Sequence, residues 1–313
     1  MDGLVAIVAG LAGGLVLTPL ARTVALRFGI VDRPGDLKTQ RVPVAYLGGV
    51  AVFLAALPGP ILAGEPLVLV PAGIALVLGL ADDLRPLPVL ARVVVELAIA
   101  VTAALVVPGP AIARIATAVL VLGLLNAVNL LDGQDGLAAG VGVVITVGFA
   151  LLGGPAVPIA LGLAGALAGF LVLNRPPARI YLGDAGAYFV GTSVALLPAL
   201  TEHAATSWST WWAVPLLLGL PVADTAIAIL RRLRAHRPLL QGDRSHVYDQ
   251  LVDRGASIGR STLVGIGVQV GLTGIGLAAT QAAPGVALGI TAFTAIALAV
   301  VAARAGFLDA TRA

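Results

Sequence analysis

Residues 126–137 read Asn-Ala-Val-Asn-Leu-Leu-Asp-Gly-Gln-Asp-Gly-Leu, a polar stretch set between apolar runs near 112–126 and 137–153. Runs of this kind approach the length at which a helix crosses the ~30 Å hydrocarbon core of a bilayer. The stretch therefore indicates two membrane helices joined by a polar turn at one membrane face. Polar groups at such helix ends are usually functional. A purely structural loop is the alternative, and the EF-hand spacing of a calcium loop is absent.

The rest of the chain repeats this pattern of apolar runs and polar turns. Of its 313 residues, 59% are hydrophobic and 11% are charged, and the mean hydropathy is +1.03. A soluble domain carries roughly 25% charged residues, so too little polar surface remains to face water on all sides. We predict an all-α, polytopic integral membrane protein of about eleven transmembrane helices in a single domain, residues 1–313. The helices are expected near 3–26, 44–63, 67–81, 89–107, 112–126, 137–153, 157–173, 185–200, 211–230, 261–280 and 284–304.

The basic residues predict the orientation, because loops that stay in the cytoplasm are enriched in Lys and Arg. With the N-terminus outside, only Arg114 of the 19 basic residues falls in an outer loop, and the C-terminus is cytoplasmic. Most aspartates also fall in the inner loops or at inner helix ends, although carboxylates contribute little to topology. Solvation of the loops is one explanation, and a shared active site is the other. The inner loops are expected near residues 27–43, 82–88, 126–136, 174–184 and 231–260.

Asp82 and Asp83 lie at the inner end of the third expected helix. Adjacent carboxylates repel, so that one is held protonated or a cation neutralises both. Arg92 and Glu96 follow on the next helix, four residues apart and therefore on one face. The alternative is an aspartate pair that merely ends a helix.

A further polar stretch spans residues 174–186 and reads Asn-Arg-Pro-Pro-Ala-Arg-Ile-Tyr-Leu-Gly-Asp-Ala-Gly. Its Gly-Asp-x-Gly turn opens a helix, and the free N–H groups of a helix N-terminus suit a phosphate. Asp184 in this turn is a candidate Mg²⁺ ligand, since that ion binds a few carboxylates together with substrate phosphates. A simple N-cap is the other interpretation of Asp184.

The long inner segment 231–260 is rich in arginine and contains His246. A basic segment next to membrane helices sets the orientation or binds anionic lipid, and it could equally hold an anionic substrate. The chain has no nucleophile–His–acid pattern, no P-loop and no zinc spacing, and the lack of cysteine excludes disulfides and thiolate metal sites. Carboxylates, arginines and a phosphate-compatible turn at one face favour phosphoryl transfer assisted by a divalent metal.

A secondary transporter and a structural or lipid-binding membrane protein are the alternatives to an enzyme. A secondary transporter often shows repeated halves and binding residues near the bilayer midplane. The sequence shows no repeat, and its carboxylates lie at one face. A structural or lipid-binding membrane protein would not need four Asp- or Asn-rich motifs on the same side.

These motifs, in this order and over nearly the whole chain, resemble the polyprenyl-phosphate N-acetylhexosamine-1-phosphate transferases. That family, glycosyltransferase family 4, includes the translocase that makes the first lipid intermediate of peptidoglycan. The matching features are the aspartate pair with Arg92, the stretches 126–137 and 174–186, and a first inner loop with Asp32, Pro34, Lys38, Pro43, Gly48 and Gly49. The UDP-N-acetylhexosamine-using branch is the more similar one.

The resemblance implies a reaction in which the phosphate of a polyprenyl phosphate attacks the β-phosphate of a UDP-sugar. The products are a polyprenyl-diphosphate sugar and UMP, and the cofactor is Mg²⁺, with Mn²⁺ as the alternative. The enzyme would perform the first membrane step of a cell-envelope glycan pathway in the bacterial plasma membrane, with its site on the cytoplasmic face. The expected partners are the two substrates, the bilayer and a second copy in a homodimer, and nucleic acid is not expected.

The resemblance also implies roles for individual residues. Asp184 would ligate Mg²⁺, and Asp82 or Asp83 would deprotonate or orient the lipid phosphate. Tyr181 occupies a position where an aromatic ring stacks on uracil, and His246 with nearby arginines would contact the diphosphate or sugar. The remaining substrate-binding candidates are Lys38, Asn126, Asn129, Asp132, Asp135, Asn174 and Arg244, of which Asn174, Asp132 and Asp135 would help to hold the nucleotide.

The chain departs from the family in two places. Members often carry Arg-Lys-x-His in the first loop, where this chain has Leu37-Lys38-Thr39-Gln40. Many carry His-x-His-His where this chain has His246-Val247-Tyr248-Asp249. These changes bear on the diphosphate contacts and on the identity of the sugar. The metal and aspartate sets are intact, so transfer is expected, with a catalytically silent homologue as the alternative.

Overall fold

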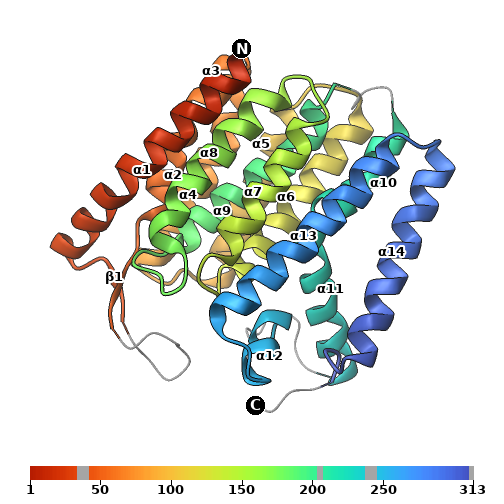
Figure 1. Cartoon of the computed structure of the whole chain (residues 1–313). Helices are drawn as coiled ribbons and strands as arrows, with labels where there is room; N and C mark the ends of the chain where they lie inside the picture. The colour runs from red at the N-terminus through yellow and green to blue at the C-terminus, as the bar shows by residue number, and fades with distance from the viewer. Residues whose placement is uncertain (34–41, 203–206, 237–244, 310–313) are drawn as a thin grey trace.

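A computed structural model describes residues 1–33, 42–202, 207–236 and 245–309 (Figure 1). The described part consists of helices and the turns between them, together with the two-residue strands β1 (Val31–Asp32) and β2 (Val44–Ala45), which pair antiparallel. The α-helices are α1 (Asp2–Phe28), α2 (Gly48–Ala56), α3 (Pro58–Leu62), α4 (Leu69–Leu84), α5 (Val89–Val106), α6 (Ala111–Leu131), α7 (Leu137–Ala150), α8 (Ala156–Asn174), α9 (Gly183–Leu196), α10 (Trp208–Leu217), α11 (Gly219–Arg234), α12 (Val247–Asp253), α13 (Ile258–Thr280) and α14 (Pro284–Arg304). Two 3₁₀ turns, η1 (Pro66–Val68) and η2 (Leu197–Leu200), precede α4 and follow α9. The predicted all-α class is confirmed.

Seven helices in the described part are long and apolar enough to cross a membrane, namely α4 with its preceding turn, α1, α5, α6, α8, α13 and α14. α10 and α11 meet at a bend of 69° and make an eighth candidate if they are taken as one span. The polytopic character is thereby confirmed, but the expected number of eleven spans is not. The expected segments near 137–153 and 185–200 form helices of only 14 residues, about 21 Å at 1.5 Å per residue. The expected segment near 44–63 is divided into the short helices α2 and α3.

Apolar side chains cover the outside of the bundle. Leu90 on α5 is 75% exposed and Phe293 on α14 is 74% exposed, although both are large and hydrophobic. Figure 1 shows α1 and α14 on opposite sides of the molecule, with α9 between them. Exposed apolar surface on this scale is suited to lipid rather than water.

The centre of the bundle is α9, whose residues Ala185–Leu196 are all buried. It packs most extensively against α4 and α6 and also contacts α2. A Cβ atom at Gly79 of α4 would collide with the backbone of Asp184 and Ala185, so only glycine allows this approach. The close contact brings the end of α4 directly against the beginning of α9.

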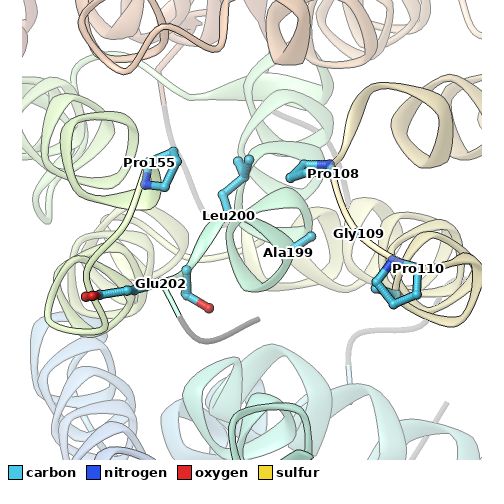
Figure 2. A pocket seen from close by; sticks show the side chains of 9 residues that line it. Pro108, Gly109, Pro110, Pro155, Ala199, Leu200 and Glu202 are labelled. Atoms are coloured by element: carbon cyan, nitrogen blue, oxygen red, sulfur yellow. The ribbon is translucent and has the colours of Figure 1, made fainter. Parts of the chain in front are cut away.

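The polar turns gather at one end of the bundle. The last turns of α4, α6 and α8 and the first turns of α7 and α9 meet there, and α12 lies at the same end in Figure 1. The opposite end carries the α5–α6 and α7–α8 connections and η2. Figure 2 shows a pocket at that opposite end, lined mainly by apolar groups such as Pro108, Pro110, Pro155 and Leu200, with Glu202 beside them. The polar end is therefore the candidate site.

Candidate functional site

Asp83, in the last turn of α4, binds the N-terminus of α9. Its carboxylate accepts the backbone N–H groups of Asp184 and Ala185, both at 3.0 Å. A helix leaves its first N–H groups without partners and carries partial positive charge there. Asp83 supplies the cap from a separate helix, whereas the residue before α9 makes no side-chain cap bond. The N-cap interpretation of Asp184 is therefore wrong, because Asp83 accepts the N–H groups at the start of α9.

Asp132, in the turn after α6, reaches the same place. Its carboxylate accepts the N–H of Gly183, which has a φ of 74° that favours glycine. Burial, with the negative charges of Asp184 and Asp83 nearby, raises the pKa of Asp132 well above its usual value. The N–H groups that the sequence suggests for a phosphate are thus bound by two carboxylates from two different motifs.

Asp82 contacts the Asp184 side chain and has two further partners that Asp83 lacks. It accepts the N–H of Leu87 at 2.7 Å and Nη1 of Arg92 at 3.1 Å. Its side chain is 6% exposed, against 32% for Arg92. The two aspartates therefore tie α4 to the next turn and helix on one side and to α9 on the other, which is more than a helix-ending pair would do.

The arrangement concentrates negative charge around the first turn of α9. Asp184 interacts electrostatically with Asp83 and Asp82, and Arg92 partly offsets them. No group of three or more His, Asp or Glu side chains in the described residues is arranged as a ready-made metal cage. Mg²⁺ does not need one, because it is usually held by one or two carboxylates plus substrate phosphates and water. The carboxylate donors at this turn fit that ion.

Asn174 joins the two polar turns to each other. Its Oδ1 accepts the N–H of Gly136 at 3.1 Å, and its Nδ2 donates to the carbonyl of Ile180 at 3.0 Å. Asp135 adds a second link by accepting the N–H of Ala178 at 2.9 Å. Burial raises the pKa of Asp135, and this N–H group opposes the shift. Asn174 and Asp135 thus hold the site together, and their contact with a nucleotide stays a prediction.

Tyr181 lies beside a tyrosine that the sequence analysis missed. The ring of Tyr46, just after β2, is 6.2 Å from the ring of Tyr181 between centroids. The backbone N–H of Tyr181 donates to Ala45 at 2.8 Å, which fixes the two segments side by side. Burial and the charge of Asp32 raise the pKa of Tyr46. Tyr46 could not be selected from the sequence, because its contact with Tyr181 forms only when the first loop folds against the turn before α9.

Asn126 and Asn129 lie in different surroundings. Asn126 donates to Oε2 of the buried Glu96 at 3.1 Å and to the carbonyl of Leu122, so it faces α5 inside the bundle. Asn129, one turn later, is partly buried, and no side-chain hydrogen bond is described for it. Lys38, Gln40 and Arg244 lie outside the described residues.

His246 precedes α12 and pairs with Asp224 of α11. Its Nδ1 lies 2.6 Å from Oδ2 of Asp224, and both side chains are 3% exposed. Asp224 is not among the site candidates predicted from the sequence. An ionisable residue within an apolar helix is the signal that could have selected it.

Comparisons with known proteins match this part of the chain. The model of glycosyl transferase family 4 matches residues 66–201, which hold all four aspartates at α9. A probable undecaprenyl-phosphate N-acetylglucosaminyl 1-phosphate transferase of Bacillus subtilis is 31% identical over 289 residues, covering 83% of this chain and 80% of that protein. A decaprenyl-phosphate N-acetylglucosaminephosphotransferase of Mycolicibacterium smegmatis is 29% identical, covering 84% and 78%. A phospho-N-acetylmuramoyl-pentapeptide-transferase of Moorella thermoacetica is 37% identical over 119 residues, 36% and 35% of the two chains.

Proposed function

The chain belongs to glycosyl transferase family 4, and from this premise we propose that it transfers N-acetylhexosamine 1-phosphate from a UDP-sugar to a polyprenyl phosphate. An oxygen of the lipid phosphate forms a bond to the β-phosphorus, the bond between the α- and β-phosphates breaks, and UMP leaves. The observation that carries the proposal is the meeting of Asp82, Asp83, Asp132 and Asp184 at the first turn of α9. Two anionic substrates can react there only if this charge is offset.

Different carboxylates are proposed to act on the two substrates. Asp184 would hold Mg²⁺, which when bound neutralises charge on the diphosphate. The aspartate pair lies on the α4 side of the same turn, where Asp82 or Asp83 would orient the lipid phosphate or accept its proton. Arg92 keeps Asp82 in place through the 3.1 Å contact. Positioning and charge neutralisation are the main contributions a protein makes to phosphoryl transfer.

The nucleotide end of the donor is assigned to the turns on the other side. Tyr181, with Tyr46 beside it, offers aromatic surface for uracil, and Asn174, Asp132 and Asp135 would help to hold the nucleotide. Asn129, in the last turn of α6, is a further proposed substrate contact. His246 is assigned to the diphosphate or sugar. Lys38 and Arg244 remain proposed substrate contacts by their place in the motifs.

The site is proposed to lie on the cytoplasmic face of a bacterial plasma membrane. The turns that carry Arg27, Arg85, Arg175 and Arg179 are at the same end as the aspartates, and cytoplasmic loops are enriched in arginine. The lipid tail stays in the bilayer while its phosphate reaches this interface. A homodimer is kept as a proposal from the family.

Purified protein and a panel of UDP-sugars test the function. UMP release is measured with and without polyprenyl phosphate, and UDP-N-acetylhexosamines are expected to give Mg²⁺-dependent release only when the lipid is present. Failure with every UDP-sugar would refute the proposal. Sugar movement into sealed vesicles without UMP release would instead favour a transporter.

A further inference from the structure

The beginning of α12 is held by a carboxylate from another helix. Asp224 lies in the first half of α11, and its Oδ2 is 2.6 Å from Nδ1 of His246. Its other oxygen, Oδ1, accepts the backbone N–H of Val247 at 3.0 Å. One buried carboxylate therefore fixes both the imidazole ring and the turn that starts α12.

This pairing determines which ring nitrogen carries a proton. An ionised carboxylate only accepts hydrogen bonds, so a hydrogen bond to ionised Asp224 requires the proton of His246 to be on Nδ1. Nε2 is then the atom left for a second partner, as an acceptor in the neutral ring and as a donor in the charged ring. A histidine held in this way presents one defined nitrogen instead of two interchangeable ones.

Tyr248 fixes the plane of the ring as well. The two rings stack with centroids 5.5 Å apart and planes 8° apart. The hydroxyl of Tyr248 donates to the carbonyl of Leu130 at 2.8 Å, two residues before Asp132. The imidazole is thereby tied to the turn that carries Asp132, although α11 and α12 are distant from that turn in sequence.

Resting on the proposed function, we infer that Asp224 is a positioning residue for sugar 1-phosphate transfer, holding His246 with Nδ1 protonated so that Nε2 is presented to the UDP-sugar. Asp224 itself is directed to the histidine and the backbone of Val247. It acts on the reaction through His246.

The substitution Asp224→Asn tests this role with little change in volume. The amide Oδ1 can still accept the N–H of Val247, which turns the NH₂ group toward Nδ1 of His246. Because that group donates, the ring changes to the form with the proton on Nε2. We expect kcat for UMP release to fall at least about tenfold, as for other groups that orient a functional histidine, while KM for the UDP-sugar changes far less. Asp253→Asn removes an exposed carboxylate from the end of α12 and should leave both constants unchanged.

Nitrogen-15 NMR reads the protonated atom directly. His203 and His236 are replaced by Gln, so that only His246 of the three histidines gives a signal. At about pH 8.5, above the ordinary histidine pKa, the wild-type ring should carry its proton on Nδ1 and the D224N ring on Nε2. A wild-type ring protonated on Nε2 overturns the inference without any variant.

The two readouts separate this inference from the proposed function. Full kcat in a D224N protein whose ring has switched overturns the positioning role and leaves the proposed function standing. A wild-type protein that releases no UMP from any UDP-sugar refutes the proposed function and the catalytic part of the inference together. Combining Asp224→Asn with His246→Gln should slow the reaction no further than His246→Gln alone, and additive losses would contradict the inference.

Discussion

Asp83 accepts the backbone N–H of Asp184 at 3.0 Å, so the aspartate pair that ends α4 is in direct contact with the aspartate that begins α9. Two motifs that are about a hundred residues apart in sequence are thus joined by hydrogen bonds of Asp82 and Asp83. Any change that separates α4 from α9 therefore affects both at once. This coupling sets the first prediction.

Gly79→Ala should disrupt the site from within α4. The added Cβ would collide with the backbone of Asp184 and Ala185, and backbone cannot move aside as a flexible side chain can. Overpacking of this kind costs typically about 1–3 kcal/mol. We expect a lower unfolding temperature in detergent and a loss of UMP release. Gly73→Ala on the same helix is the control, because its Cβ would meet nothing closer than 3.9 Å; equal behaviour of the two variants would contradict the packing argument.

Asn174→Ala should reduce stability as well as activity, whereas Asn129→Ala should reduce activity alone. The first change leaves the Gly136 N–H and the Ile180 carbonyl without their partner, at a cost of about 1–3 kcal/mol for each buried unpaired group. Asn129 has no described bond to lose. Thermal unfolding and steady-state kinetics on both variants separate the two roles. Loss of activity in Asn174→Ala with unchanged stability would show that its bonds to the two turns matter little.

Asp184→Asn should lower UMP release by about a hundredfold or more, since loss of several kcal/mol of charge stabilisation corresponds to that factor. Chelation of divalent metal should abolish the activity of the wild-type protein, and added Mg²⁺ should restore it. Mg²⁺ affinity, measured by the concentration that gives half-maximal rate, should weaken in the variant. Asp184→Asn with full activity and unchanged Mg²⁺ dependence would rule out the metal assignment.

Arg92→Met should slow transfer at least about tenfold, because Asp82 would lose its cationic partner and the aspartates would repel one another more strongly. Arg92→Lys should recover part of the rate, since it restores the charge without the planar guanidinium. Arg85→Met removes an exposed arginine from the adjacent turn and serves as the control. Rates at several Mg²⁺ concentrations are the measurement, and a slow Arg85→Met would point to a general effect of surface charge.

Much of the fold could be predicted from the lengths of the apolar runs in the sequence. The expected segments near 3–26, 89–107 and 284–304 correspond to α1, α5 and α14 within a few residues. The number of full spans does not follow, because the short helices α7 and α9 are apolar enough to be read as spans. α7 ends before a turn in which Gly153 and Gly154 have positive φ, and α9 passes into the 3₁₀ turn η2, so each helix is shorter than its apolar run.

The candidate site, like the fold, could be predicted from the sequence only in part. The gathering of four Asp- or Asn-rich motifs at one end of the bundle could be predicted from the sequence. Each apolar run that crosses the membrane puts the following turn on the opposite face, so the face of each turn follows from the order of the runs. Which carboxylate meets which group could not, as with Asp83 at the backbone of α9 or Asp224 at His246. Asn126 is an example, because it belongs to the polar stretch 126–137 but its side chain donates to Glu96 on the neighbouring helix α5. Partners of this kind depend on helix rotation, which spacing alone does not determine.

The 69° bend between α10 and α11 has an evolutionary consequence. The aspartates gather at the central helix α9, where a Cβ atom at Gly191 would meet the backbone of α6 and one at Gly79 of α4 would meet the backbone of α9 itself. Asp224 and His246 are carried on the arm beyond the bend, which makes fewer contacts with that centre. Substitutions in the arm can therefore alter where His246 lies without disturbing the packing that anchors the aspartates, so the two parts of the site can change independently during evolution.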